Sequence, residues 1–462
     1  MRTALPTLIA SMAALLHLSS STGVAAGAAP VELPEVTRTR LANGLTVFVV
    51  PRKVPEVELR LVIRAGAVND PAGQEGLASL TANLLSRGAG ARSAERLAGD
   101  IASAGASMAT RADLEQITVT CSVPRPQLES GLDLLRDLVV SPTFAPEEFE
   151  RARAAALDSI AARQRVPEVV ADLALGPFLF GDGPLAHPVM GHEESVRRLA
   201  RDSVVAFHAR HMRPDNALLA VVGDVDPRTL VGVLGRTFAG WSGSAARRLE
   251  AKSAASQAGG RALLIVDMPE VSRTQIRLAC VGVARNHPDR YPIQVANAIL
   301  GAAFTARRAR EARAGGPPAS SSSRFTTWRH TGAFDIQSFT GHETIRPTVD
   351  TVLADVRRLR DQGPTAEELA RARQAVAAQF ALGLQTPAEL SARILDVEFY
   401  GLEPDYLRGF PARIEAVTME DVRRALKSYF CDDDLRILLV SDAEVARPQL
   451  EGLGPIEVRD AE

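Results

Sequence analysis

Apolar residues along the chain recur with two periods, one typical of helices and one typical of strands. The stretch "GLASLTANLLSRGAG" places Leu77, Leu80, Leu84 and Leu85 on one face of an expected helix over 75–87. In "ITVTCSVP" and "SRTQIRLACVGV" apolar residues alternate as in half-buried strands, and "NALLAVVGDVDP" is a continuous apolar run typical of a fully buried strand. The mixture predicts an α+β protein.

The order of expected elements occurs twice. "DSVVAFHARHM" precedes "NALLAVVGDVDP" just as "MEDVRRALKSYF" precedes "DLRILLVSDAEV", so Asp224 and Asp442 stand at equivalent points 218 residues apart. The small, polar segment 241–260 between the copies is rich in Ala and Ser and contains Gly, as linkers are. We therefore expect two homologous domains, 29–240 and 261–462, joined by a linker over 241–260.

The N-terminus has the pattern of a signal peptide over 1–28. Arg2 supplies the positive start, "ALPTLIASMAALLHL" the apolar run, and "AAGAAP" a cleavage site after Ala28. The alternative is an uncleaved anchor, although the run is short against the about 20 residues of a membrane span. We expect an exported, periplasmic protein without a stable membrane span.

The net charge and the cysteines indicate which partners and which cross-links are not expected. A formal net charge of −2 argues against nucleic acid as a partner. Cys121, Cys280 and Cys431 are widely spaced, which predicts neither a disulfide framework nor a cysteine zinc pair; Cys121 and Cys280 are expected as small buried residues on strands. The segment 308–324, "RAREARAGGPPASSSSR", is expected as a flexible loop, either plain surface or close to a ligand.

Motifs over nearly the whole mature chain resemble the pitrilysin/insulinase (inverzincin) metallopeptidase family. In the first half these are "LANGLTVFVV", "GQEGLASLTANLLSRGA" and "HPVMGHEESVRRL"; in the second they are "VANAILG", "GAFDI", "TAEELARARQAV" and "IEAVTMEDVRRAL". The resemblance implies two homologous domains, each a mostly antiparallel sheet with helices packed on it.

The family's zinc motif is missing from the helix that should carry it. Active members have H-x-x-E-H there: two His bind zinc and the Glu is the general base. Ser79, Ala82 and Asn83 occupy those positions here, so the N-terminal domain has a degenerate zinc site. By resemblance, the position of the third zinc ligand is occupied by Leu157. Asp158, one residue away, is the alternative for this position. We expect no metal and no catalytic residue in this chain.

The sequence offers two further candidate sites. His208 and His211 in "HARH" could share a helix face as metal ligands, but the family's equivalent segment is structural. The family's second half holds substrate with an Arg and a later Tyr, and these positions are Arg313 and Ser320 here. Arg313 is therefore expected to bind substrate, the alternative being one of several solvated arginines.

The resemblance implies a function in a complex. Bacterial members often form pairs in which one subunit supplies zinc and the other closes the chamber. We expect this chain to be the non-catalytic subunit, inactive alone, with zinc in a zinc-bearing partner subunit and a peptide as substrate. The alternative is a structural or peptide-binding protein with no peptidase role.

Overall fold

A computed structural model of the protein describes residues 33–243, 260–313, 320–432 and 434–461. The predicted signal peptide lies outside these residues, as does most of the predicted linker. The first half contains six strands, β1 (Thr37–Arg40), β2 (Thr46–Pro51), β3 (Glu56–Ile63), β4 (Ser107–Ala112), β5 (Ile117–Pro124) and β6 (Ala217–Gly223). Its helices are α1 (Leu77–Leu85), α2 (Ala94–Ser103), α3 (Leu128–Val140), α4 (Pro146–Arg163), α5 (Pro167–Phe180), α6 (Glu193–Arg198), α7 (Arg201–His211) and α8 (Pro227–Thr237).

The second half has a similar order of elements, and its first helix, with 24 residues against 9, is much longer than that of the first half. Its strands are β7 (Ala262–Asp267), β8 (Thr274–Gly282), β9 (Ser320–Thr327), β10 (Gly332–Thr340), β11 (Arg436–Ser441) and β12 (Ile456–Asp460). Its helices are α9 (Arg290–Arg313), α10 (Ile345–Gln362), α11 (Ala366–Leu382), α12 (Pro387–Tyr400), α13 (Tyr406–Glu415), α14 (Met419–Tyr429) and α15 (Ala443–Leu450).

The two sheets have matching topologies. The first has the strand order β1-β2-β6-β3-β5-β4 and the second β12-β7-β11-β8-β10-β9. In each, the central strand, β6 or β11, pairs parallel with one neighbour and antiparallel with the other. The sheets differ at one edge, where β1 runs antiparallel and β12 parallel to the next strand. The predicted α+β fold with two mostly antiparallel sheets is confirmed.

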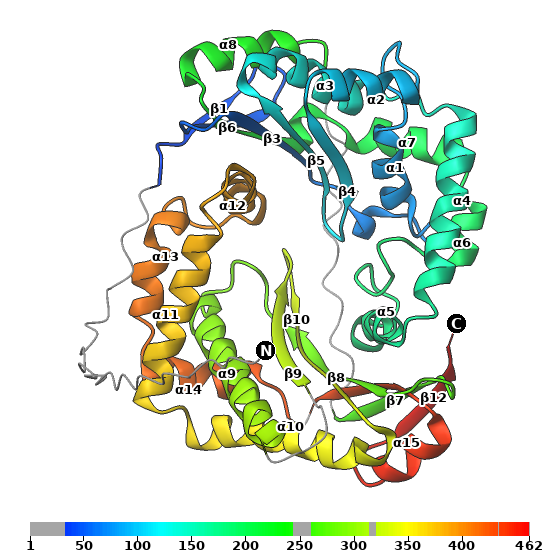
Figure 1. The fold of residues 1–462 in the computed structure, drawn as a ribbon, viewed down its shortest axis with the longest axis vertical. Coiled ribbons are helices and arrows are strands. Elements are labelled where there is room, and N and C mark those ends of the chain that lie inside the picture. The colour runs from blue at the N-terminus through cyan, green and yellow to red at the C-terminus, as the bar shows by residue number, and fades with distance from the viewer. Residues whose placement is uncertain (1–32, 244–259, 314–319, 433, 462) are drawn as a thin grey trace, which may run out of the picture.

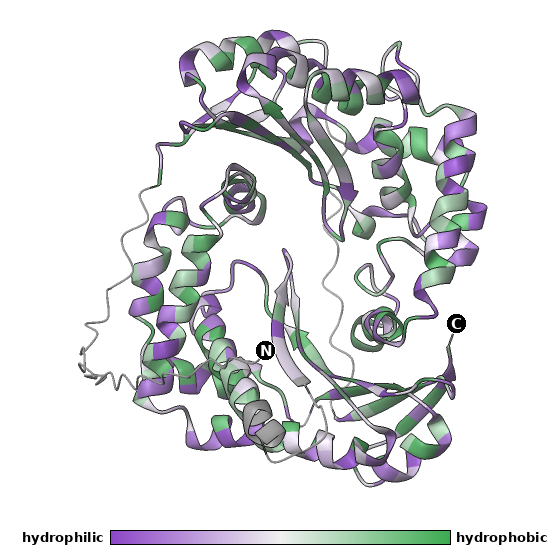
Figure 2. Cartoon of the chain, in the orientation of Figure 1, coloured by the Kyte–Doolittle hydropathy of each residue, from purple (hydrophilic) through white to green (hydrophobic). Residues whose placement is uncertain are grey.

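Each sheet is covered on one face by helices of its own half and on the other by a helix of the opposite half. Helix α5 leaves the first half and packs on β8 and β11, while α12 leaves the second half and packs on β6 and β3. Figure 1 shows α12 beneath the first sheet and α5 beside the second. The central strands are therefore buried on both faces, which explains their continuous apolar runs (Figure 2).

An arginine on a strand holds each exchanged helix, buried at Arg277 and half-buried at Arg60. Arg277 on β8 is 1% exposed; it donates to Asp172 Oδ1 at 2.9 Å and to the carbonyl of Glu168 at 3.2 Å, both on α5. At the matching place on β3, Arg60 donates to Ser391 Oγ at 2.8 Å and to the carbonyl of Ala388 at 3.3 Å, both on α12. Glu168 and Ala388 are each the second residue of their helices. The two contacts therefore correspond to each other, as the two sheets do.

Two expectations about the second half were wrong. Cys280 and Cys431 form a disulfide with a Cα–Cα distance of 6.4 Å, because the fold brings the segment just after α14 next to β8. Only Cys121 is free, and it is buried on a strand as expected.

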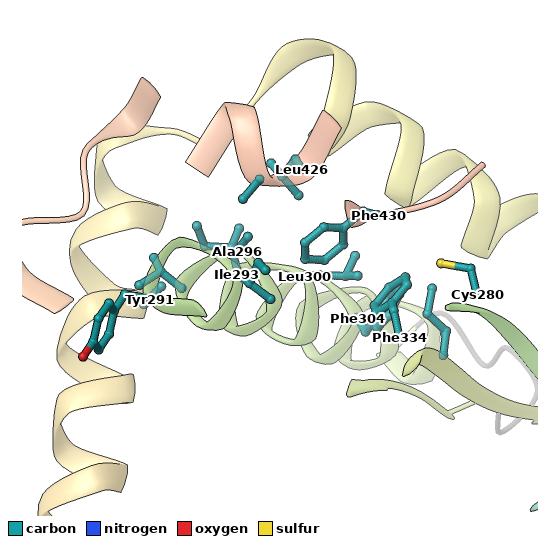
Figure 3. Packing of buried hydrophobic residues seen from close by; sticks show 14 of the residues in the cluster. Cys280, Tyr291, Ile293, Ala296, Leu300, Phe304, Phe334, Leu426 and Phe430 are labelled. Carbon is teal, nitrogen blue, oxygen red and sulfur yellow. The ribbon is translucent and has the colours of Figure 1, made fainter. Parts of the chain in front are cut away.

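The segment 308–324 is also not one long loop. The α9 helix runs on to Arg313 and β9 begins at Ser320 and pairs with β10, so a serine-rich sequence forms an edge strand. Figure 3 shows Tyr291 in the first turn of α9, and Phe334 and Phe430 beside the later turns of this helix, all in one buried cluster.

We predict that Arg277→Ala lowers the free energy of unfolding by about 3 kcal/mol, because charge-assisted bonds to α5 are lost from a buried site. Urea unfolding followed by circular dichroism measures this change. The control is Arg96→Ala, whose side chain is 74% exposed and whose ion pair with Asp100 should contribute less than about 1 kcal/mol. An effect of Arg277→Ala no larger than that of the control would contradict a fastening role.

Candidate functional site

The start of α1 is held by a buried carboxylate. Asp70 accepts hydrogen bonds from the backbone N–H groups of Gly76 and Ala78, both at 2.8 Å. Burial raises the pKa of Asp70 to about 7, although these two bonds favour its charged form. Gly76 has a φ of 97° and Gly191 packs so closely that an added Cβ would lie 2.1 Å from the carbonyl oxygen of Glu75. The position of the helix is therefore tightly determined.

The buried face of α1 is the one expected from its leucines. Leu77, Leu80, Leu84 and Leu85 are all at most 3% exposed and belong to the core of the first half. Of the three degenerate positions, Ser79 is half-buried, Ala82 is 1% exposed and Asn83 is exposed. A hydroxyl, a methyl group and an amide thus occupy the helix positions where the family's peptidases have imidazole, carboxylate and imidazole.

A chain of polar side chains joins α1 to α4. Arg87 donates through Nε to Asn83 Oδ1 at 2.8 Å and through Nη1 to Glu148 Oε2 at 3.3 Å. The other carboxylate oxygen of Glu148 accepts a bond from Arg151. Glu148 is 7% exposed, so its charge is compensated by two guanidinium groups. This series of hydrogen bonds was not predicted from the sequence. The one sequence signal for it was an acidic residue in the first turn of α4, which is usually explained by the helix dipole.

The two candidate third-ligand residues differ in environment. Leu157 on α4 is half-buried and packs against the same core that contains Ala82, whereas Asp158 is exposed to solvent. An alkyl side chain offers no lone pair to a metal ion. Within the described residues no group of three or more His, Cys, Asp or Glu side chains has an arrangement that could hold a metal ion.

His208 and His211 have structural environments. The Nε2 atom of His208 lies 2.8 Å from the carbonyl oxygen of Val139, and its ring meets Phe144 edge-on. His211 packs on Phe207 with ring centroids 4.5 Å apart, and burial lowers its pKa to about 4. Both rings are therefore neutral near pH 7 and occupied with packing or hydrogen bonding.

The predicted substrate residue cannot be placed by its side chain. Arg313 is the last residue of α9 and Ser320 the first of β9, and the side chains of both lie outside the described residues. The structure establishes only that the backbone leaves α9 at Arg313 and joins the sheet edge at Ser320.

Comparison with known proteins identifies relatives along most of the chain. A family model described as insulinase (peptidase family M16) matches residues 47–193, and one described as peptidase M16 inactive domain matches residues 198–376. An uncharacterized zinc protease of Streptomyces coelicolor is 24% identical over 92% of this chain and 91% of its own length. Subunit 1 of the mitochondrial cytochrome b-c1 complex of Bos taurus is 25% identical over 62% of this chain and 60% of its own.

Solved structures show the same fold. A peptidase M16 inactive domain from Pseudomonas fluorescens has a TM-score of 0.81 at 25% identity and covers 88% of this chain and 98% of its own. A protease from Helicobacter pylori also has a TM-score of 0.81, at 17% identity, over 88% of this chain and 100% of its own.

We predict that restoring the helix ligands alone yields weak zinc binding. In Ser79→His/Asn83→His two imidazoles lie four residues apart, but the third ligand and the groups that orient the imidazoles are missing. Adding Leu157→Glu should strengthen zinc binding at least about tenfold if Leu157 holds the third position. Titration against a chromogenic chelator measures the affinity.

The matched control adds Asp158→Glu to the same double variant. A larger gain from Asp158→Glu than from Leu157→Glu would assign the third position to Asp158. The unchanged chain, measured by elemental analysis after dialysis, should hold no stoichiometric zinc.

Proposed function

Because this chain belongs to the insulinase (M16 peptidase) family and has Ser79, Ala82 and Asn83 at the zinc-motif positions, we propose that it is an exported non-catalytic subunit of a zinc peptidase complex. In this proposal it closes the chamber and contributes substrate contacts, and a zinc-bearing relative supplies the catalytic metal. The chain has no peptidase activity alone.

One observation carries the proposal. The structure around α1 is complete, but the residues at its zinc-motif positions are neither zinc ligands nor a general base. The helix start, its buried face and its contact with α4 are all formed, and a guanidinium joins the two helices. A water molecule would have neither a metal ion nor a carboxylate base at these positions to activate it.

Export is supported by two features. The first 28 residues have the signal-peptide pattern, and the Cys280–Cys431 disulfide is typical of oxidising compartments such as the periplasm. Among the helices of the described residues, none combines the length and the apolar character that crossing a membrane requires.

The exposed hydrophobic residues indicate what kind of interface the proposed partner would meet. The large hydrophobic residues exposed on the described surface come singly from separate segments: Val36, Val166, Val205, Leu382, Val445 and Val458. Such scattered residues do not form an apolar patch of the kind that marks an obligate interface. We infer that pairing uses polar and charged contacts and weakens as salt is raised.

The second candidate is a structural subunit with no peptidase role. The similarity to subunit 1 of the cytochrome b-c1 complex favours it, because that relative is named as part of an assembly and not as a protease. Ser320 at the family's tyrosine position also fits this alternative.

We predict that the tagged chain, purified from its native source at low salt, brings with it a relative that carries intact H-x-x-E-H. Mass spectrometry identifies the partner, and size-exclusion chromatography with light scattering gives the stoichiometry. Peptide cleavage should require both chains. Separate elution of the two chains at micromolar concentration and low salt would count against a peptidase complex and favour the structural alternative.

We also predict that Arg313→Ala lowers kcat/KM of that complex by about ten- to a hundredfold, the effect of losing a charge-assisted bond to substrate. Arg313→Lys should restore little, because an ammonium group does not replace a planar guanidinium. Arg307→Ala and Arg308→Ala are the controls on the same helix. Equal, small effects at all three positions would show that Arg313 is a solvated charge.

A further inference from the structure

The second half has a pocket at the place that corresponds to the degenerate zinc site. In the first half α1 packs against β4, α4 and α7, and in the second half α9 packs against β9, α11 and α14. The two helices therefore occupy equivalent positions. Between α9 and α11, beside β9, lies a pocket of about 540 Å³, to which α12 and α13 also contribute. Its size falls in the range of small-molecule and peptide-residue sites.

Among the described residues that line the pocket, four are arginines and none carries a carboxylate. Those arginines are Arg285, Arg290, Arg324 and Arg393. The first three have carboxylate partners in Asp396, Glu403 and Asp335 respectively, none of which lines the pocket. The fourth, Arg393 on α12, is half-buried and makes no hydrogen bond or ion pair with any described residue. Arg393 is attracted to the buried carboxylate of Asp396 on the same helix, which pairs with Arg285, but it makes no direct ion pair with it. The N–H groups of Arg393 therefore remain available to a ligand.

Hydrogen-bonding capacity along the walls is also unused. Eight buried side-chain polar atoms lack a partner within the described part of the chain, and four of them belong to residues that line this pocket. These four are Arg285 Nε, Arg290 Nε, Asn297 Oδ1 and Ser323 Oγ. Buried polar atoms without partners are uncommon in folded proteins, so their concentration here indicates a site that a ligand completes.

The remaining lining is apolar and aromatic. Phe380 and Phe410 stack with ring centroids 3.8 Å apart, and Phe325, Tyr406 and Ile293 add further apolar surface. Gln294, Asn297 and Gln379 supply amide groups between the arginines and this surface. A simple inorganic anion would use the arginines and leave the aromatic wall without contact.

We propose that this pocket binds the C-terminal residue of a peptide that ends in a large apolar side chain. The terminal carboxylate pairs with Arg393, the apolar side chain packs on the aromatic wall, and the amide side chains bond the peptide group. Carboxylate recognition by a guanidinium is strong and directional, whereas an amide terminus would leave Arg393 unpaired. The inference goes beyond the proposed function because it requires no partner subunit and no cleavage.

The experiment uses the purified full chain alone. Fluorescence anisotropy measures binding of an N-terminally labelled pentapeptide ending in Phe, as the free acid and as the C-terminal amide. We expect the acid to bind about ten- to a hundredfold more tightly. Arg393→Ala should remove that difference, and Gln379→Glu, which adds a negative charge to the lining, should weaken acid binding at least about tenfold.

The matched control is Arg408→Ala, which removes an exposed arginine of α13 that does not line the pocket and should leave both affinities unchanged. Circular dichroism melts confirm that each variant is folded; Arg393→Ala breaks no direct hydrogen bond or ion pair of the described residues and should keep a cooperative transition. Equal binding of acid and amide would overturn the proposal, and so would a difference that persists in Arg393→Ala. Displacement of the peptide by an equal concentration of inorganic phosphate would also overturn it, since it would show a phosphate site.

Discussion

The architecture depends on the reciprocal exchange of α5 and α12. A central strand such as β6 is apolar on both faces, and helices of its own half cover only one of them. The second face, with Phe48, Val62 and Leu218, joins the core to which α12 contributes. Each such side chain contributes about 1.5–3 kcal/mol to the free energy of folding when it is fully buried. An isolated half would expose this face to water and lose that contribution. The halves are thus one cooperative body, in contrast to domains that meet through a small polar interface.

Helices α1 and α4 are joined by polar side chains at the place where the family's zinc motif would lie. A zinc ion bound by ligands from α1 and α4 would join those helices through coordination bonds. In this chain a guanidinium lies between Asn83 and Glu148 and joins the same helices through hydrogen bonds. The guanidinium places a positive group near α1, but it is not a Lewis acid as a zinc ion is.

Local sequence signals predicted the fold well and the contacts between its halves poorly. The leucine spacing of α1 and the apolar run of β6 depend on neighbours within a few residues or on one sheet, and both expectations are confirmed. The Cys280–Cys431 pairing and the hydrogen bond from Arg87 to Glu148 join residues 151 and 61 positions apart, which local patterns do not reveal. The strand from Ser320 was missed although its partner is the next strand, β10, because serines are not typical strand residues. Arg60 and Arg277 were a visible signal, since each interrupts an apolar strand, but their partners are on helices of the opposite half. The assignment of Ser79, Ala82 and Asn83 came from motif resemblance, and the pocket at Arg393 had no sequence signal at all.

The Cys280–Cys431 disulfide makes the two halves topologically unequal. The bond closes a covalent ring that runs from β8 through α9 to the end of α14 and therefore includes α12, the helix that covers the first sheet. Its counterpart α5 belongs to an open segment, since Cys121 is the free cysteine of the first half. An unfolded chain with the bond intact therefore keeps the ends of the second half's helical layer together, while the first half can extend fully. Refolding would therefore start from a chain whose second half is already closed into a covalent loop and whose first half is open.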